Sequence, residues 1–421
     1  MRVKNILVFP CGSEVALEIV EACKFTRHFH LIGGSSVDDH GRFAYSDYIG
    51  NLPMLGDGAL ISDLARIVKE RKIDAIYPAM DAVAAELKAH EKELGCIVVS
   101  SPTTTADTCM SKLQTYEKLQ EYVRVPKTYN SLDEVRYPAF VKPDIGYGSR
   151  GTFVAETAKD LKAAILDSEL LVLEYLPGEE YTVDCFTDAR GDLLYCGPRT
   201  RERVRNGISV RSVPVSDKGE FRSFADSING ALELRGGWFF QVKRDSSGQL
   251  CLLEVACRIA GSSSLARARG ANLPLAALFD ATGYTVAIET NDYDIELDRA
   301  LDSSYALKLD YSQVYVDYDD CLVLNNGSIN TELIAYLYEC VNLHKRITLL
   351  SRHKGSLADD LAQKRLDVLF DEVIHIGPSE SKADYVTNLD CIFIDDSFAE
   401  RKDVAKLGVP VFAPDIVKCL I

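Results

Sequence analysis

The stretch that decides the fold covers residues 137–154 and reads YPAFVKPDIGYGSRGTFV. A short apolar strand, residues 139–141, brings Lys142 to its end, and a turn with three glycines follows before a second apolar strand begins. Glycines let backbone N–H groups approach an anion closely, and a lysine beside them adds a positive charge to phosphate oxygens. The stretch therefore indicates a phosphate-binding loop; the alternative is a glycine-rich hairpin with one solvated lysine. The glycines are Gly146, Gly148 and Gly151.

The length and the net charge of the chain limit the classes of protein to which it can belong. Its 421 residues predict about three domains, and the net charge of −16 argues against a nucleic-acid or anionic-membrane partner. The apolar run ILVFP near the N-terminus is too short for a signal peptide, and no later segment is long enough to span a membrane. Twelve single cysteines without a CxxC pair predict reduced thiols. We therefore expect a cytoplasmic protein, with a homo-oligomer left open.

Residues 4–101 alternate short apolar runs with amphipathic helical segments, which is typical of a βαβ series with a parallel sheet. The loop after the first strand reads PCGSE and lacks the GxGxxG pattern, so no NAD site is expected there. We interpret this part as a Rossmann-like layer on the substrate side, or as a purely structural layer.

A helix is predicted over residues 105–122 and another over 158–166, before two strands within residues 170–186.

Four arginines follow these strands, at every second position in the middle of the chain. If the arginine segment is extended, its period of two places all four side chains on one face. That face either binds an anion or is a solvated strand edge. The arginines are Arg199, Arg201, Arg203 and Arg205.

A helix is predicted near residues 221–234, and a hairpin then spans residues 236–256 around a turn at 245–248. Gln241 lies on one of its strands and Glu254 on the other. Amide and carboxylate oxygens on adjacent strands beside a phosphate loop are suitable Mg²⁺ ligands, because Mg²⁺ favours oxygen donors that it shares with phosphates.

The order of these motifs resembles that of ATP-grasp enzymes, most of all the carbamoyl-phosphate-synthase-like branch. The resemblance covers roughly residues 1–310 and implies ATP and Mg²⁺ as cofactors. It assigns the phosphates to Lys142 and the glycine loop, Mg²⁺ to Gln241 and Glu254, and the transferred phosphate to Arg258. It further implies that Gly146, Gly148, Ser149 and Gly151 cover the ATP phosphates, that Glu174, Tyr175 and Leu176 meet adenine, and that Glu180 holds the ribose.

One position departs from that family. The metal-binding strand usually reads Glu, hydrophobic, Asn, Pro, Arg, whereas this chain has Glu254, Val255, Ala256, Cys257 and Arg258. A methyl group cannot coordinate a cation, so either one Mg²⁺ site is weakened or another group or water substitutes.

Acidic, hydroxyl and lysine side chains follow the strands of residues 312–421. Asp317 and Asp319 end one apolar strand, Ser351 ends the next, and Lys382 begins a later helix. Strand ends of an α/β unit gather in one crevice, although a single strand-end Asp is often only a helix cap. The third strand ends in Asp395 and Asp396.

This second unit resembles the haloacid-dehalogenase-like (HAD) phosphatases. The resemblance implies that Asp317 is a nucleophile, that Asp319 is a general acid and base, and that Ser351 and Lys382 hold the phosphoryl oxygens. Attack by a carboxylate on phosphorus requires neutralisation of the approaching charges, which a cation and a lysine supply. The residues from Asp319 to Ser351 leave no room for a large cap. The implied Mg²⁺ site draws on Asp317, Asp319, Asp395 and Asp396.

We therefore predict an α/β and α+β multidomain protein. Its parts are a Rossmann-like pre-ATP-grasp domain over residues 1–104, an ATP-grasp fold over 105–311 and a Rossmannoid HAD-like domain over 312–421. The predicted function is an ATP-dependent carboxylate–amine ligase that forms an acyl phosphate, fused to an Mg²⁺-dependent phosphohydrolase. Arg199 and Arg201 are candidate catalytic groups that clamp an acidic substrate. Alternatives are an ATP-grasp phosphotransferase paired with a phosphatase, and an ATP-binding regulatory module without turnover. The expected partners are a small-molecule carboxylate and an amine.

Overall fold

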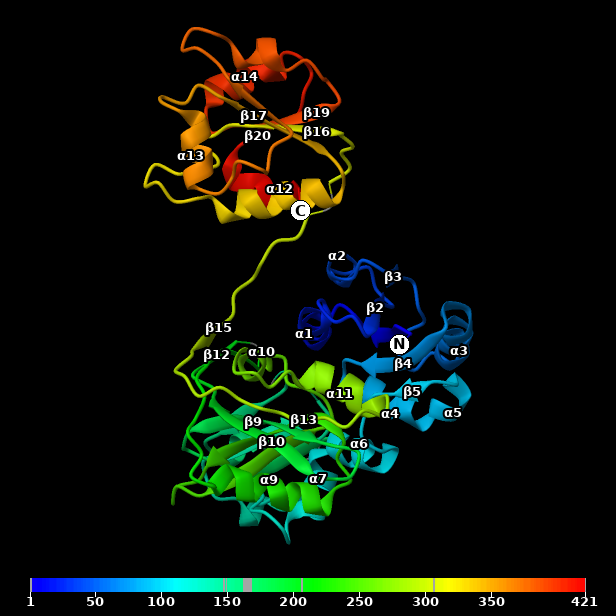
Figure 1. Ribbon diagram of the computed structural model, residues 1–421. Helices are drawn as coiled ribbons and strands as arrows, with labels where there is room; N and C mark the ends of the chain where they lie inside the picture. The colour runs from blue at the N-terminus through cyan, green and yellow to red at the C-terminus, as the bar shows by residue number, and fades with distance from the viewer. Residues whose placement is uncertain are drawn as a thin grey trace. The chain divides into compact units, whose positions relative to one another are not determined.

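A computed structural model describes residues 2–146, 148, 150–161, 169–205, 207–305 and 307–420. The chain forms two compact units, Met1–Leu301 and Asp302–Ile421, which are shown in Figure 1 and are treated separately below. The predicted limits of three domains remain predictions. Among the described residues, no helix combines the length and the apolar character that crossing a membrane requires.

The first unit begins with a parallel five-stranded sheet in the order β3-β2-β1-β4-β5. Its strands are apolar and mostly buried because helices cover both faces, as expected from the predicted βαβ series. The strands are β1 (Lys4–Phe9), β2 (Phe29–Gly34), β3 (Tyr48–Ile49), β4 (Ile73–Pro78) and β5 (Ile97–Val98). The helices are α1 (Glu14–Cys23), α2 (Gly41–Ala44), α3 (Leu60–Arg71), α4 (Asp81–Ala89) and α5 (Glu91–Leu94).

The single helix predicted over residues 105–122 is wrong, because the chain forms two helices, α6 (Thr103–Met110) and α7 (Lys112–Leu119). Ser111 between them has an extended backbone, and its hydroxyl accepts a hydrogen bond from Gln114 N at 3.1 Å. Serine is a favoured N-cap, so α7 starts anew at this position.

A small antiparallel sheet, in the order β7-β6-β8, carries the glycine-rich stretch. Its strands are β6 (Ala139–Pro143), β7 (Phe153–Ala155) and β8 (Leu170–Glu174), and α8 (Ala158–Leu161) lies between the last two in the sequence. The later part of the helix predicted over residues 158–166 lies outside the described residues.

The rest of the first unit, residues 105–301, is called the grasp-like part below. Its largest sheet is antiparallel and has four strands in the order β10-β9-β13-β14. Helix α9 (Glu220–Ala231) packs with α7 on one face of this sheet, where Trp238 and Phe240 are buried; Figure 1 shows both helices along that side. Directly paired residues of neighbouring strands share a face. The strands are β9 (Glu180–Thr187), β10 (Leu193–Thr200), β13 (Gly236–Arg244) and β14 (Leu250–Ala256).

The predicted single face of four arginines is wrong. Strand β10 ends at Thr200, and β11 (Arg203–Arg205) pairs with β12 (Ile208–Ser212) and β15 (Leu297–Asp298) in a separate three-stranded sheet. Arg199 is buried against Asp184, and Arg201 is buried with the half-buried Glu180 as its partner, whereas β11 is exposed.

The parallel sheet and the grasp-like part share a hydrophobic core. Ile6 and Ile19 of the first sheet layer belong to the same buried cluster as Phe186, Ile259 and Leu278. The helices that close this core are α10 (Ser264–Ala268) and α11 (Leu273–Ala281). Burial across this boundary makes Met1–Leu301 one compact unit.

The second unit is a parallel five-stranded sheet, in the order β18-β17-β16-β19-β20, with helices on both faces. Helix α12 (Thr331–Asn342) packs against one face and α14 (Phe398–Ala405) against the other. The strands are β16 (Gln313–Val316), β17 (Arg346–Ser351), β18 (Glu372–His375), β19 (Cys391–Ile394) and β20 (Val411–Phe412). The remaining helices are α13 (Leu357–Gln363) and the short 3₁₀ segments Lys382–Tyr385 and Pro414–Leu420; a further one in the first unit is Leu132–Glu134.

Candidate active sites in the two units

Lys142 sits at the end of β6 with its side chain buried between two elements of the first unit. Its Nζ donates to the Tyr116 hydroxyl at 2.7 Å and to the Leu253 carbonyl at 3.0 Å. The Tyr116 hydroxyl itself donates to the same carbonyl at 2.8 Å. Burial lowers the pKa of Lys142 to about 8, while the nearby Glu254 carboxylate opposes that shift. The structure therefore holds the Lys142 ammonium group beside the strand that carries Glu254.

A β-bulge makes the Leu253 carbonyl available. Gln241 pairs with Glu254 and Val242 pairs with Leu252, so Leu253 is an extra residue on β14. A bulged residue leaves the regular ladder, and here its carbonyl accepts the two hydrogen bonds from Lys142 and Tyr116.

A second buried lysine, Lys112, supports the glycine loop and was not among the predicted site residues. Its Nζ donates to the carbonyls of Asp144 at 2.9 Å and Gly146 at 3.2 Å. Ser111 and the Leu113 backbone bind the Asp144 carboxylate at 2.8 and 2.7 Å. A lysine directly after a helix-capping serine was the available signal, and it is a weak one.

The loop itself has the backbone that glycine permits. Gly148 and Gly151 both have positive φ, 65° and 70°, a conformation that other residues rarely adopt. A Cβ on Gly207 would lie 2.2 Å from the Gly148 carbonyl carbon, so the turn between β11 and β12 touches the loop closely. The predicted Ser149 lies outside the described residues.

The residues assigned to the nucleoside lie at the ends of β8 and β9. Glu174 ends β8, where its carboxylate accepts a hydrogen bond from Lys127 N at 3.1 Å and pairs with Arg124 at 2.9 Å. Leu176 is buried, Tyr175 is exposed, and both follow directly. Glu180 begins β9 and lies 2.6 Å from Arg201 Nε in an ion pair without hydrogen-bond geometry.

The predicted metal ligands Gln241 and Glu254 are direct partners on β13 and β14 and share one face of the sheet. On the same face, Ala256 pairs with Phe239, and the two pack together with Ala260. An aromatic ring therefore fills the neighbourhood where the family pattern has asparagine. The donor set on this face fits one Mg²⁺ shared with phosphate oxygens.

Arg258 follows β14 and pairs with the first residue of α4. Its Nε donates to Asp81 Oδ2 at 2.9 Å, and its guanidinium carbon lies 5.3 Å from the Phe239 ring centroid. The predicted phosphate ligand is thus held against the parallel-sheet layer, with its side chain 20% exposed. Asp81 was not among the predicted site residues.

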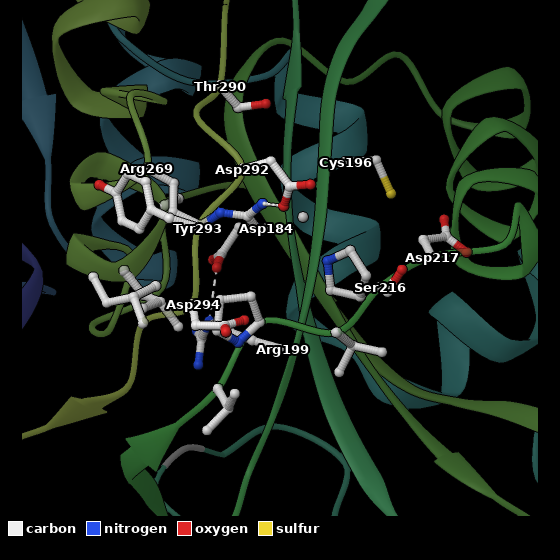
Figure 2. A pocket seen from close by; sticks show the side chains of 18 of the residues that line it. Asp184, Cys196, Arg199, Ser216, Asp217, Arg269, Thr290, Asp292, Tyr293 and Asp294 are labelled. Atoms are coloured by element: carbon white, nitrogen blue, oxygen red, sulfur yellow. Dashed lines mark hydrogen bonds and ion pairs between the residues drawn. The ribbon is translucent and has the colours of Figure 1, made fainter.

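Arg199 is also held by an acid that the sequence interpretation missed. Its Nε donates to Asp184 Oδ2 at 2.7 Å, and both side chains are almost fully buried. Asp184 follows Thr182 on β9 by two residues, and Thr182 is the direct partner of Gln241. The pair lines a cavity of about 680 Å³, which Figure 2 shows.

Three carboxylates gather at the carboxyl ends of β16 and β19 in the second unit. Oxygen atoms of Asp317, Asp395 and Asp396 lie within 4.8 Å of one another. Burial, followed by repulsion from Asp317, raises the pKa of Asp395 to about 6, and the same two causes raise that of Asp396. Asp317 and Asp395 are buried, whereas Asp396 is exposed. Carboxylate oxygens at this spacing are suitable ligands for a divalent cation. Asp319 is not part of this group.

Lys382 connects two of these carboxylates. Its Nζ donates to Asp395 Oδ2 at 2.6 Å and lies 2.8 Å from Asp317 Oδ1, where it makes an ion pair without hydrogen-bond geometry. Burial alone would lower the pKa of Lys382, yet Asp317 and Asp395 raise it above its ordinary value. Ser351 at the end of β17 is buried, and its hydroxyl has no hydrogen-bond partner within the described part of the chain.

His353 holds Asp319 outside the three-carboxylate group. Its Nδ1 lies 2.9 Å from Asp319 Oδ1, and its Nε2 lies 2.8 Å from Asp360 Oδ2. The ring also packs edge-on against Tyr318, with centroids 4.9 Å apart. His353 was missed because a lone histidine two residues after a strand end carries no motif.

The first unit is similar to ATP-grasp proteins. Residues 167–300 match the model of a family described as ATP-grasp in the biosynthetic pathway with the Ter operon. A D-alanine–D-alanine ligase of Clostridium botulinum is 34% identical over 65 residues, which cover 14% of this chain and 22% of the relative. A carbamoyl phosphate synthase large chain of Methanothermobacter thermautotrophicus is 23% identical over 282 residues, 59% of this chain and 26% of the relative. The chain thus spans about a quarter of these curated relatives.

Comparison with a solved structure also indicates an ATP-grasp fold for the first unit. N5-carboxyaminoimidazole synthetase of Staphylococcus aureus, in complex with ADP, superposes with a TM-score of 0.58 at 17% identity, over 68% of this chain and 80% of that one. The first unit therefore belongs to the class of α/β folds. More narrowly, it has the ATP-grasp fold, as the sequence predicted.

Proposed function

We propose that the first unit is an ATP-dependent carboxylate–amine ligase. A substrate carboxylate attacks the γ-phosphorus of ATP and releases ADP, and an amine then displaces phosphate from the acyl phosphate to form an amide. The observation that carries the proposal is the buried Lys142, whose Nζ donates to the carbonyl of Leu253, the residue directly before Glu254 of the Gln241–Glu254 pair. The likeness to a D-alanine–D-alanine ligase supports the same reaction class.

The residues of this site have different roles, which follow from the charge of their side chains. Lys142 and the loop of Gly146, Gly148 and Gly151 bind the phosphates, and the loop rests on Lys112. Gln241 and Glu254 would hold Mg²⁺, and the bound cation would supply positive charge to neutralise the transferred phosphoryl group. Arg201 and Arg258 supply guanidinium groups toward the developing oxyanion. Because Ala256 offers no oxygen, a single metal held by Gln241 and Glu254 is proposed.

The test is ADP release from the full chain with Mg²⁺ and a panel of amino acids and sugar acids, and Lys142→Ala is the loss-of-function variant. Lys118→Ala, an exposed lysine on α7, is the matched control. If no carboxylate stimulates ADP release that depends on Lys142, the ligase is excluded. A stable phosphorylated product seen by ³¹P NMR would instead support the phosphotransferase alternative.

We propose further that the second unit is an Mg²⁺-dependent HAD-like phosphohydrolase with an open site. The grouping of Asp317, Asp395 and Asp396 around Lys382 carries this proposal. Asp317 would attack phosphorus to form an aspartyl phosphate, and Lys382 and Ser351 would hold the phosphoryl oxygens. Asp319 would move the proton of the leaving group and of the attacking water.

Hydrolysis of p-nitrophenyl phosphate in the presence of Mg²⁺ tests the second site. We expect Asp317→Asn to abolish turnover, because an amide cannot act as the nucleophile. Asp359→Asn, on the exposed side of α13, is the control. Equal activity of Asp317→Asn and the parent would exclude this mechanism and favour a regulatory module.

A further inference from the structure

The cavity beside Arg199 in the first unit has an acidic lining that the proposed ligase chemistry does not use. It is bounded by β9, β10, the segment after β12, α10 and residues 290–296. Five carboxylates line it, against two guanidinium groups, Arg199 and Arg269. The carboxylates belong to Asp184, Asp217, Asp292, Asp294 and Glu296.

Most of these charges already have partners. Figure 2 shows Arg199 bound to Asp184 and Arg269 bound to Asp292. Asp217 accepts hydrogen bonds from backbone amides at the start of α9, including Gly219 N at 2.8 Å. Glu296 pairs at 2.7 Å with Arg211, which lies outside the lining. Both cations of the cavity are therefore neutralised, and the excess of negative charge rests on Asp217 and Asp294.

Asp184 Oδ1 is the observation that points to a ligand. The Asp184 side chain is 1% exposed, its Oδ2 binds Arg199, and its Oδ1 has no hydrogen-bond partner among the described residues. A buried carboxylate oxygen without a donor is costly, so such an atom beside a cavity calls for a donor from outside the chain.

The chemistry of that donor follows from the surroundings. A cavity of about 680 Å³ has the size of a small-molecule site and is far larger than a metal ion requires. On the rim, Asp294 is exposed and makes no ion pair among the described residues. A ligand with an ammonium or guanidinium group satisfies Asp184 Oδ1 and matches the excess negative charge.

The place of Asp184 on the sheet connects the cavity to the proposed metal face. Thr182 pairs directly with Gln241, so Asp184, two residues on, is the diagonal neighbour of Gln241 on the same face. Diagonal neighbours in an antiparallel sheet are about 7–8 Å apart. A bound molecule of a few carbon atoms can therefore span the distance from Asp184 to Gln241 along that face.

We propose that this cavity binds an organic cation through Asp184, with Asp294 as a second attractive charge at its rim. In the ligase it would anchor the amine substrate by a cationic group that does not react; that role, unlike the binding itself, rests on the proposed function. The reacting amine would then be the far end of a diamine or a basic amino acid.

Calorimetric titration of the full chain without ATP tests the binding. The cationic probes are 1,4-diaminobutane, agmatine and lysine; 1,4-butanediol and succinate are the uncharged and anionic matches of the first. We expect at least one cationic probe to bind and the two matched controls not to bind. Absence of binding by all three cations, or equal binding of butanediol or succinate, overturns the proposal.

Variants locate the site. Asp184→Asn should weaken binding by about ten-fold, because the charge that faces the ligand is lost. Since this change also leaves Arg199 buried without its partner, thermal unfolding must show a folded variant. The rim variant Asp294→Asn avoids that difficulty and should weaken binding by about three-fold. Glu121→Gln, exposed and outside the lining, is the control and should leave binding unchanged. Unchanged binding in Asp294→Asn and in a folded Asp184→Asn overturns the assignment.

The binding and the ligase activity fail in distinguishable ways. Cation binding without any Lys142-dependent ADP release supports the cavity and excludes the ligase. Conversely, ADP release without binding of any cation supports the ligase and overturns the cavity proposal.

Discussion

Lys142 Nζ lies 2.7 Å from the hydroxyl oxygen of Tyr116, and both groups donate to the carbonyl of one bulged residue, Leu253. A strand-end lysine is thereby fixed beside the Gln241–Glu254 pair before any nucleotide arrives. The arrangement keeps a charged group buried in the free protein, which must lower stability, and it has measurable consequences.

Because burying the charged Lys142 lowers stability, replacing it should raise the free energy of unfolding, by an amount that depends on pH. Its pKa is lowered from 10.5 to about 8 by burial. Below pH 8 both states are protonated and the full cost is present; between pH 8 and 10.5 the unfolded state binds more protons, so stability rises with pH. We expect Lys142→Met to be more stable than the parent by roughly 3 kcal/mol at pH 7, with the difference vanishing toward pH 10.5. Urea unfolding across this pH range measures it.

Lys118→Met is the control for that experiment, because Lys118 is an exposed lysine on α7. Its difference from the parent should stay near zero and should not depend on pH. A Lys142→Met variant that is less stable than the parent at pH 7 would contradict the prediction.

Tyr116→Phe should weaken ATP binding without abolishing it. The change removes the acceptor at 2.7 Å from Lys142 Nζ but keeps the ring that fills the core. Loss of one hydrogen bond to a charged group corresponds to about 1.5 kcal/mol, or roughly ten-fold in ATP affinity. Fluorescent ATP-analogue titration measures the affinity, and Tyr122→Phe, at an exposed tyrosine, should match the parent.

The carboxylate group of the second unit predicts an opposite pH dependence in the absence of metal. The pKa of Asp395 is raised from 3.8 to about 6, so the folded state binds the proton more tightly. Stability of the second unit should fall as the pH rises from about 4 to 6, by roughly 2 kcal/mol, and Asp395→Asn should lose this dependence. Thermal unfolding in EDTA measures the fall. Added Mg²⁺ should restore the stability at pH 7; an unchanged melting temperature with Mg²⁺ argues against a metal site.

His353 should matter for turnover more than for substrate affinity. It holds the Asp319 carboxylate at 2.9 Å and is itself held by Asp360. His353→Ala should lower kcat for p-nitrophenyl phosphate by about 10² while KM changes little, because Asp319 loses its orientation as acid and base. His353→Gln, which keeps a donor toward Asp319, should recover part of the loss. Equal kcat in the parent and in His353→Ala would show that Asp319 needs no such support.

The local pattern of apolar and polar residues was enough to predict much of the architecture. The apolar runs and their periods predicted the parallel sheet of the first unit, the hairpin of β13 and β14, and the strands β16, β17 and β19 with polar residues at their ends. These features depend on neighbours in the sequence, such as the alternation that buries one face of a strand or the strand-end position that places Asp317 and Asp395 at one edge.

The sequence by itself determined which residues stand at strand ends and beside the glycine loop, because those positions follow from period and turn chemistry. The tertiary structure alone decided their partners. The pairing of Asp184 with Arg199, of Asp81 with Arg258 and of His353 with Asp319 joins residues that are distant in the chain. Such pairs form because a buried charge requires an opposite charge or a hydrogen bond, and which partner is within reach depends on the packing of the chain, as in the register of β9 and β10 that brings Asp184 close to Arg199.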